Sequence, residues 1–149
     1  MGKSNKPERI SGKNIAMNET NKNLVRRYYE EIWNQWDDEA VDQLIAADIS
    51  FHGSLGISVE GLDGFRDYVA RVRAAFPDFH NAINDLIAES DNVVAVLTYT
   101  GTHCGELFGI APTGRRISYR GIAVFQIRDG KISKGYVLGD TQTLRTQLE

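Results

Sequence analysis

The chain is poor in the residues that build cross-linked, metal-bound or membrane-spanning folds. Its 149 residues include one cysteine, Cys104, and three histidines. A single thiol excludes an internal disulfide and leaves too few thiolates for a structural zinc site. The longest apolar run, Val93 to Leu97, is far shorter than the ~20 residues that a transmembrane helix needs. We therefore expect no metal, no cofactor and no membrane partner.

An excess of charge of one sign is also missing. Lys and Arg number 17 against 20 Asp and Glu, which gives a net charge of −3. Because nucleic-acid binding requires a basic surface, we expect no nucleic-acid partner. Hydrophobic residues make up 42% and charged residues 25%, which is close to the globular average and excludes wholesale disorder. With no secretory signal pattern at its start, the chain is expected to be one cytoplasmic domain.

The first sixteen residues differ from the rest of the chain. They hold four basic side chains, one acidic side chain and little apolar content. We expect a disordered basic tail over residues 1–19 and a single folded domain over residues 20–149. A basic arm that touches nucleic acid or a membrane is the less favoured alternative.

Helical periodicity dominates the first half of the sequence. Apolar residues at every fourth position, Leu24, Tyr28, Ile32 and Trp36, predict one helix over residues 20–36. The next predicted elements are a short helix capped by Asp37 or Asp38, a short strand over Ile49 to His52, and a third helix from Leu62 to Phe76.

The second half changes to the patterning of long strands. Asp129-Gly130 stands between two alternating runs, which is a hairpin signal. The predicted strands are Phe79 to Glu89, Val93 to His103, Ile117 to Arg128 and Ile132 to Asp140, and a short helix from Thr141 to Leu148 follows them. Helices followed by antiparallel hairpins indicate an α+β fold.

The strand from Ile117 to Ile127 predicts how the protein associates. Its odd positions are typical of a core face, and its even positions form a partly apolar outer face that includes Ile122 and Val124. Exposed apolar patches usually mark an interface. We therefore expect a homodimer or a higher homo-oligomer.

Several stretches resemble a known family. Gly101 to Arg116 is similar to the signature loop of the SnoaL-like polyketide cyclases, a family of the nuclear transport factor 2-like superfamily. Arg73 to Asp78, Phe125 to Ile132 and Asp140 to Leu148 are similar to other family segments, so the resemblance spans residues 22–148. It implies a cystatin-like cone, in which a curved, mostly antiparallel sheet wraps around N-terminal helices. A small-molecule pocket is expected inside the cone.

The resemblance also implies a chemistry that this chain cannot copy unchanged. The family cyclases close a ring by an intramolecular aldol step, with an acid/base aspartate on the last strand and no metal or cofactor. That aspartate aligns with Val137, a cavity histidine with Ala123, and a neighbouring glutamine with Gly121. Valine cannot move a proton, so the acid/base group of the cyclases is replaced.

Other residues of the chain could supply acid/base chemistry. Proton abstraction beside a carbonyl needs a carboxylate or imidazole with a pKa near neutral, and a donor for the enolate oxygen. The candidates are His52, before a glycine-rich loop, His103, inside the signature loop, and Asp140, at the end of the last predicted strand. Each of these residues also has a structural alternative. Either histidine could form its hydrogen bonds within its own loop, and Asp140 could cap the closing helix.

Aromatic and apolar positions complete the expected site. We expect Tyr29, Trp33, Tyr119, Tyr136 and Val137 to line a largely apolar cavity with a histidine, His52, at its polar end.

Two functions remain open. The first is a cofactor-independent cyclase, isomerase or hydrolase acting on a small apolar carbonyl or ester compound. The alternative is a non-catalytic module of the same fold that binds a small apolar ligand or a partner.

Overall fold

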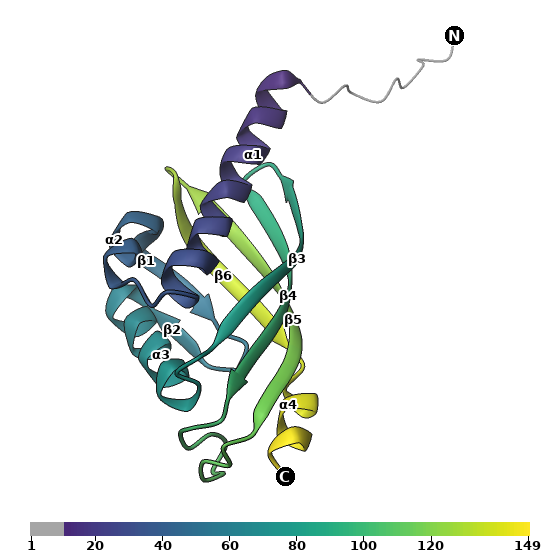
Figure 1. Cartoon of the computed structure of the whole chain (residues 1–149). Helices are drawn as coiled ribbons and strands as arrows, with labels where there is room; N and C mark the ends of the chain where they lie inside the picture. The colour runs from purple at the N-terminus through teal and green to yellow at the C-terminus, as the bar shows by residue number, and fades with distance from the viewer. Residues whose placement is uncertain (1–10) are drawn as a thin grey trace.

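The first half of the chain is mainly helical and the second half forms long strands, as the patterning predicts (Figure 1). The structure is a computed structural model that describes residues 11–149. Its elements, in chain order, are α1 (Gly12–Arg27), the π-helix η1 (Tyr28–Trp33), α2 (Asp38–Leu44), β1 (Ile45–His52), β2 (Ser58–Glu60), α3 (Gly61–Ala75), β3 (His80–Glu89), β4 (Asn92–Thr102), β5 (Arg116–Arg128), β6 (Lys131–Gly139) and α4 (Thr141–Leu148).

One curved sheet organises the molecule. Its strand order is β2-β1-β6-β5-β4-β3, and every neighbouring pair is antiparallel except β1 and β6, which run parallel. Helix α1 and η1 lie across the concave face, with α2 and α3 beside them (Figure 1). This arrangement confirms the predicted α+β cone of a mostly antiparallel sheet around N-terminal helices.

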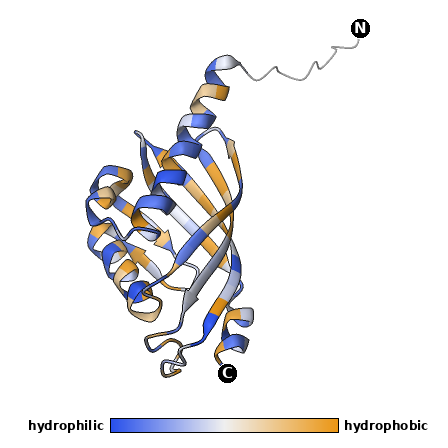
Figure 2. Ribbon diagram, viewed as in Figure 1, coloured by the Kyte–Doolittle hydropathy of each residue, from blue (hydrophilic) through white to orange (hydrophobic). Residues whose placement is uncertain are grey.

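The predicted alternation of β5 is confirmed along its whole length. Odd positions from Ile117 to Ile127 are buried and even positions are exposed, because successive side chains of a strand point to opposite faces. Figure 2 shows the same alternation of hydrophobic and hydrophilic residues along the strands. The predicted hairpin is confirmed as well, since Asp129 and Gly130 both have the positive φ, 51° and 74°, that its two-residue turn requires.

The N-terminal boundary differs from the sequence expectation. Helix α1 begins at Gly12 and is capped by the Ser11 side chain, which accepts a hydrogen bond from the Asn14 N–H. Residues 12–19 are therefore helical, while the first ten residues of the predicted tail lie outside the described part of the chain. The pattern missed these turns because they project beyond the sheet and present no continuous apolar face (Figure 1).

The predicted helix over residues 20–36 also changes its winding. From Tyr28 to Trp33 it becomes a π-helix, and the Asn34 N–H donates to the carbonyl of Tyr29 at 2.9 Å. The wider turn brings four of its six side chains into the core: Tyr28, Tyr29, Ile32 and Trp33. Single π-turns inside helices are often found at functional sites, and this one supplies the floor of the pocket described below.

Two shorter features were also missed. Strand β1 begins at Ile45 rather than at residue 49, and the following loop contains β2. A register irregularity in the β1–β6 pairing between Ile45 and Ser50 breaks the simple alternation there, which is why the first residues of β1 did not show a strand pattern.

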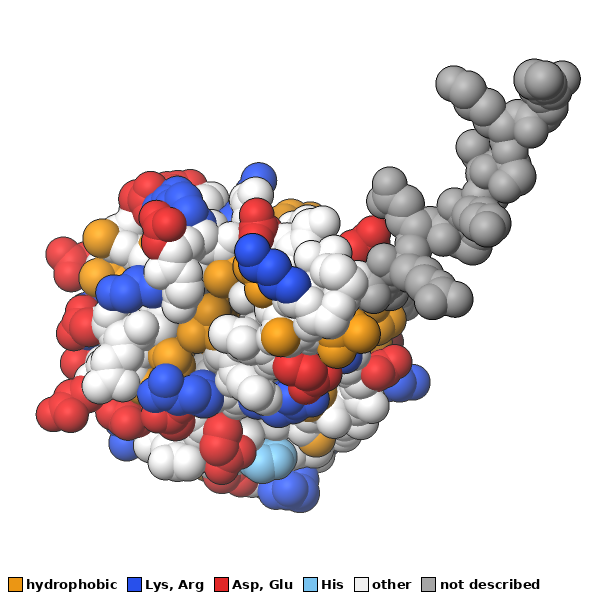
Figure 3. Space-filling model, turned by 90° about the horizontal axis from the view of Figure 1, so that it is seen from above, with side chains coloured by type: hydrophobic (Ala, Val, Ile, Leu, Met, Phe, Trp, Pro, Cys, Tyr) orange, Lys and Arg blue, Asp and Glu red, His pale blue; other side chains and the backbone are white. Residues whose placement is uncertain are grey.

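No helix within residues 11–149 is long and apolar enough to cross a membrane. On the face seen from above, acidic and basic side chains alternate around scattered hydrophobic ones (Figure 3).

Removing residues 1–16 should leave the fold intact. The side chains of Ser11 to Ala16 are all exposed, so their loss removes almost no buried apolar area. We expect the midpoint of thermal unfolding, followed by circular dichroism, to change by no more than a few degrees. A larger drop would mean that this segment packs on the domain.

Candidate functional site

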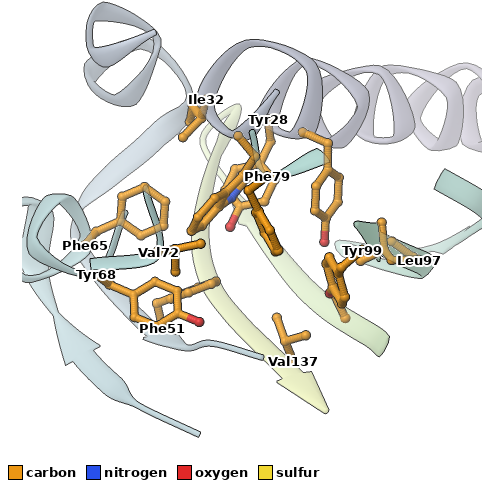
Figure 4. Packing of buried hydrophobic residues seen from close by; sticks show 14 of the residues in the cluster. Tyr28, Ile32, Phe51, Phe65, Tyr68, Val72, Phe79, Leu97, Tyr99 and Val137 are labelled. Atoms are coloured by element: carbon orange, nitrogen blue, oxygen red, sulfur yellow. The ribbon is translucent and has the colours of Figure 1, made fainter. Parts of the chain in front are cut away.

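A small cavity lies between η1, α3 and the inner face of the sheet. Its volume is about 20 Å³, which is room for roughly one water molecule and far below the ~300–1,000 Å³ of pockets that hold drug-sized ligands. Side chains from helices and strands converge on this space (Figure 4). The lining residues are Tyr28, Tyr29, Trp33, Phe51, Ser54, Tyr68, Val72, Phe79, Asn81, Tyr99 and Val137.

Aromatic rings fill most of the cone. Trp33 makes edge-to-face contacts with Phe65, Tyr68 and Phe79 at centroid distances of 5.9 to 6.2 Å. Phe79 in turn stacks on Tyr99 at 5.6 Å. Because such pairs favour these offset and edge-on geometries, the rings around the cavity hold one another in place.

The tyrosine hydroxyls of this region fall into two groups. Ser54 Oγ lies 2.9 Å from the hydroxyl of Tyr119, and the Tyr68 hydroxyl accepts a hydrogen bond from the Leu55 N–H at 3.3 Å. The hydroxyls of Tyr29 and Tyr99 have no hydrogen-bond partner in the described part of the chain, although both residues line the cavity and are 3% exposed.

These phenols are neutral. Burial raises the pKa of Tyr29 and of Tyr99 well above the ordinary value, and neighbouring tyrosines raise both further. A neutral phenol donates a hydrogen bond but does not take up a proton. The lining of the cavity therefore includes two neutral hydroxyls that have no partner in the described part of the chain.

Tyr99 can lie where it does because β5 carries a glycine opposite its ring. A Cβ atom on Gly121 would lie 2.7 Å from Cε2 of Tyr99, closer than such atoms approach. Any side chain at this position would push the ring away. The resemblance to the cyclases places a glutamine at this position. A glutamine side chain and the ring of Tyr99 could not both occupy this space.

Val137 and Ala123 both face inward. They are cross-strand partners on β6 and β5, they are 5% and 0% exposed, and Val137 lines the cavity. The positions where the resemblance to the cyclases places an aspartate and a histidine thus belong to the interior, but they hold side chains that cannot titrate. No aspartate, glutamate or histidine is among the lining residues.

His52 does not lie at the polar end of the cavity, so this expectation was wrong. Its neighbour Phe51 points inward, and strand alternation turns the imidazole to the opposite face of the sheet. There its Nδ1 lies 2.7 Å from Ser58 Oγ, and its ring stacks on Tyr136 at 4.7 Å. Tyr136 is itself 52% exposed and next to the inward Val137, so its expected place in the cavity was wrong for the same reason.

His103 is buried in its own loop. Its Nδ1 accepts a hydrogen bond from the Thr113 N–H at 3.1 Å and lies 3.0 Å from Thr113 Oγ1. Its backbone N–H and carbonyl pair with Arg115 and Gly114. Since Nδ1 is an acceptor, the proton is on Nε2, which is buried without a partner. His103 holds the loop of residues 103–115 closed and does not line the cavity.

Asp140 caps helix α4, as its structural alternative proposed. Its carboxylate accepts hydrogen bonds from the Thr143 N–H at 3.1 Å and the Thr143 hydroxyl at 2.6 Å. These two bonds lower the pKa of Asp140. An exposed carboxylate that stays ionised is a poor general acid, and it lies outside the internal cavity.

Three of the five expected ligand-binding residues, Tyr29, Trp33 and Val137, line the cavity, and Tyr119 stands behind Ser54. Sequence reasoning missed most of the other lining residues. Tyr99 lies on a predicted strand, and Tyr68 and Val72 lie on the predicted third helix, but the patterns did not show that these side chains share one space. Ser54 and Asn81 come from irregular or edge positions that carry no pattern.

Within residues 11–149, no group of three His, Cys, Asp or Glu side chains could hold a metal ion.

Two substitutions of Asp140 test whether its carboxylate caps helix α4. Because its pKa in the folded protein is depressed, Asp140 stabilises the fold above the pKa it has in the unfolded chain. That contribution is lost as the pH falls through the lower, folded value. Asp140→Ala should lower the unfolding midpoint at pH 7, whereas Asp140→Asn, which still caps, should lower it much less. Equal losses in thermal denaturation for the two variants would contradict the capping role.

Comparisons with known proteins agree with this architecture. The sequence profile of the SnoaL-like polyketide cyclase family matches residues 23–148. Among solved structures, AclR from Streptomyces galilaeus, provisionally named a hydroxylase, is 27% identical, with a TM-score of 0.76 over 88% of this chain and 96% of its own. IdmH from Streptomyces antibioticus, provisionally named a polyketide cyclase, is also 27% identical, with a TM-score of 0.75 over 86% and 97%.

TsrD from Streptomyces laurentii is 25% identical, with a TM-score of 0.78 over 87% of this chain and 95% of its own. A search of curated proteins finds no match. The names of the similar structures span more than one activity, so they do not decide the reaction. The profile covers nearly all of the described chain, and the chain therefore belongs to the SnoaL-like polyketide cyclase family.

Proposed function

We propose that this protein binds a small, flat, largely apolar molecule bearing a carbonyl oxygen, and that it does so without acid/base catalysis. The observation that carries the proposal is the lining of the cavity: aromatic rings and neutral hydroxyls, with no carboxylate or imidazole among them. Apolar pockets with a few convergent polar groups are the usual form of small-molecule sites. The free hydroxyls of Tyr29 and Tyr99 suit a carbonyl acceptor.

Binding requires the rings to move apart. The cavity as it stands holds about 20 Å³, so a ligand of ring size displaces part of the aromatic lining. The stack of Tyr99 on Phe79 is the natural point of opening, because the Tyr99 hydroxyl has no hydrogen bond to lose. The proposed ligand then gains the hydrogen bond that the closed form lacks.

A probe pair tests this directly. Acetophenone and ethylbenzene have similar shapes, but only the ketone accepts a hydrogen bond. We expect titration, followed by the fluorescence of the buried Trp33, to show tighter binding of the ketone. Tyr99→Phe should weaken ketone binding roughly two- to tenfold, the worth of one neutral hydrogen bond, and leave ethylbenzene unaffected. Binding of neither probe, or equal binding of both, would contradict the proposal.

A second candidate is an enzyme that polarises its substrate through the same hydroxyls. Neutral donors placed in a dry site stabilise a developing oxyanion, and Tyr29 and Tyr99 are both neutral and unpaired. What this cavity lacks for ring closure is a base. Val137 occupies the inward position where the cyclases carry one.

Val137→Asp should therefore restore an aldol step. Burial would raise the pKa of the new carboxyl toward neutral, so its carboxylate could take the α-proton of a linear 1,5-diketone. The enolate carbon then bonds to the distant carbonyl carbon, whose oxygen receives the proton, and a six-membered β-hydroxyketone forms. We expect turnover by chromatography with Val137→Asp, and none with the natural protein or with the uncharged Val137→Asn control. Turnover by the natural protein would overturn the non-catalytic proposal.

We also propose that the outer face of the sheet joins two copies of the chain. Val96, Ile122 and Leu138 form one cross-strand row on this face, and Val124 and Tyr136 belong to the next. Ile122, Val124 and Leu138 are 50%, 45% and 70% exposed, so the patch holds large apolar side chains beyond the two that the sequence indicated. A second copy is favoured because Arg120 and Asp140 border the same depression and give it both signs of charge.

Replacing both Ile122 and Val124 with lysine should give a monomer. Two like charges in the centre of a self-complementary patch repel their copies in the partner. Light scattering should show a dimer or higher oligomer for the natural protein and a monomer for the variant, with unchanged circular dichroism. A natural protein that is monomeric at high concentration would refute the interface.

A further inference from the structure

A second hollow lies on the helical side of the molecule, between the end of η1, α2 and α3. Its volume is about 170 Å³, and it shares no lining residue with the aromatic cavity. Its floor is apolar, and its charged residues are Asp37, Asp38, Arg66 and Arg73. It is too small for a drug-sized ligand but large enough for the end group of one long side chain.

Trp36 is held in this hollow in an unusual conformation. Its φ is +57°, in the left-handed region that bulky residues rarely adopt. The indole N–H donates to the carbonyl of Pro77 at 3.1 Å, and the ring edge meets Trp33 at a centroid distance of 6.2 Å. The backbone and both contacts thus fix the ring. Strain of this kind persists where the surrounding structure enforces it, often at ligand sites.

The face of the Trp36 ring is already occupied by a cation. The guanidinium of Arg73 lies over it, with Cζ 5.4 Å from the centroid, a cation–π arrangement. Arg73 is exposed and forms no ion pair with any residue of the described chain. Because cation–π contacts at exposed sites are weak, another guanidinium could displace it.

The charge of the hollow favours such a replacement. Arg66 is paired with two carboxylates, those of Asp38 at 2.8 Å and Asp42 at 2.9 Å. Asp42 lies outside the hollow, so the charged groups that line it besides Arg73 are the carboxylates of Asp37 and Asp38 and the guanidinium of Arg66. Once Arg73 swings away, the hollow presents an aromatic face beside two carboxylates and one guanidinium, an excess of one negative charge.

We propose that this hollow binds a guanidinium group, such as that of an arginine side chain, stacked on Trp36 in the place of Arg73. Guanidinium is favoured over other cations because it stacks on aromatic faces and its planar fork matches carboxylate oxygens. Arg73 occupies the site in the absence of the ligand and competes with it. The site is separate from the aromatic cavity, so it does not depend on the ligand proposed there.

The test uses the full chain and two matched probes. N-acetyl-arginine amide carries the guanidinium, and N-acetyl-citrulline amide has the same shape without the charge. Binding is followed by the indole N–H resonance of Trp36 in NMR, which Trp36→Phe identifies by its loss. We expect the arginine probe to shift this resonance with a dissociation constant on the order of 1–10 mM, and the citrulline probe to leave it in place.

Three variants make the test specific. Arg73→Gln removes the internal competitor and should tighten binding about two- to fivefold. Asp37→Asn keeps the cap of α2 but removes a charge, and should weaken binding. Ala74→Ser, on the same helix and outside the hollow, is the control and should change nothing.

Free L-arginine distinguishes the source of the group. Equal binding of free arginine and the amide assigns the site to a small molecule, and tighter binding of the amide assigns it to a partner polypeptide; either result supports a guanidinium site. The proposal is overturned if the citrulline probe binds as well as the arginine probe, if neither shifts the Trp36 resonance, or if Arg73→Gln leaves the affinity unchanged.

Discussion

The structure depends on burying several aromatic rings from one short helical segment against the concave face of the sheet. Four of the six residues of the π-turn, Tyr28, Tyr29, Ile32 and Trp33, are buried there. The sheet and its loops make room for these rings and their neighbours by carrying glycine where the rings approach: a Cβ on Gly53 would lie 2.0 Å from Cζ of Tyr68. The helix winding and the glycine positions are thus two parts of one packing solution.

That packing decides the chemistry open to the cavity. A cone filled with aromatic rings excludes water, and burial then raises the pKa of each phenol within it. Phenols that stay neutral can orient and polarise a carbonyl, but they cannot remove a proton near neutral pH. Val137, where the resemblance to the cyclases places their aspartate, keeps the same space apolar. This lining is the reason why we propose recognition of a ligand rather than proton transfer.

The sequence predicted the fold well because strands and amphipathic helices leave local signals. The alternation of β5 and the Asp129-Gly130 turn are properties of neighbouring residues, and both were confirmed. The site was harder, because which face of β1 is inner depends on its pairing with β6, far along the chain. His52 was misplaced for that reason. The π-turn left no local signal either, since the apolar spacing of Tyr28 and Ile32 fits an α-helix equally well.

Strand alternation also explains why the groups with the most obvious chemistry are outside the cone. His52 and Tyr136 stack on one another on the outer face, while their chain neighbours Phe51 and Val137 line the cavity. Each of these strands thus contributes side chains to both faces of the sheet. A substitution on one face leaves the side chains of the other face unchanged. A new acid/base group can reach the cavity only by replacing an inward residue. It must then bear the full penalty of burial, and that penalty is also what would bring its pKa close enough to neutral to be useful.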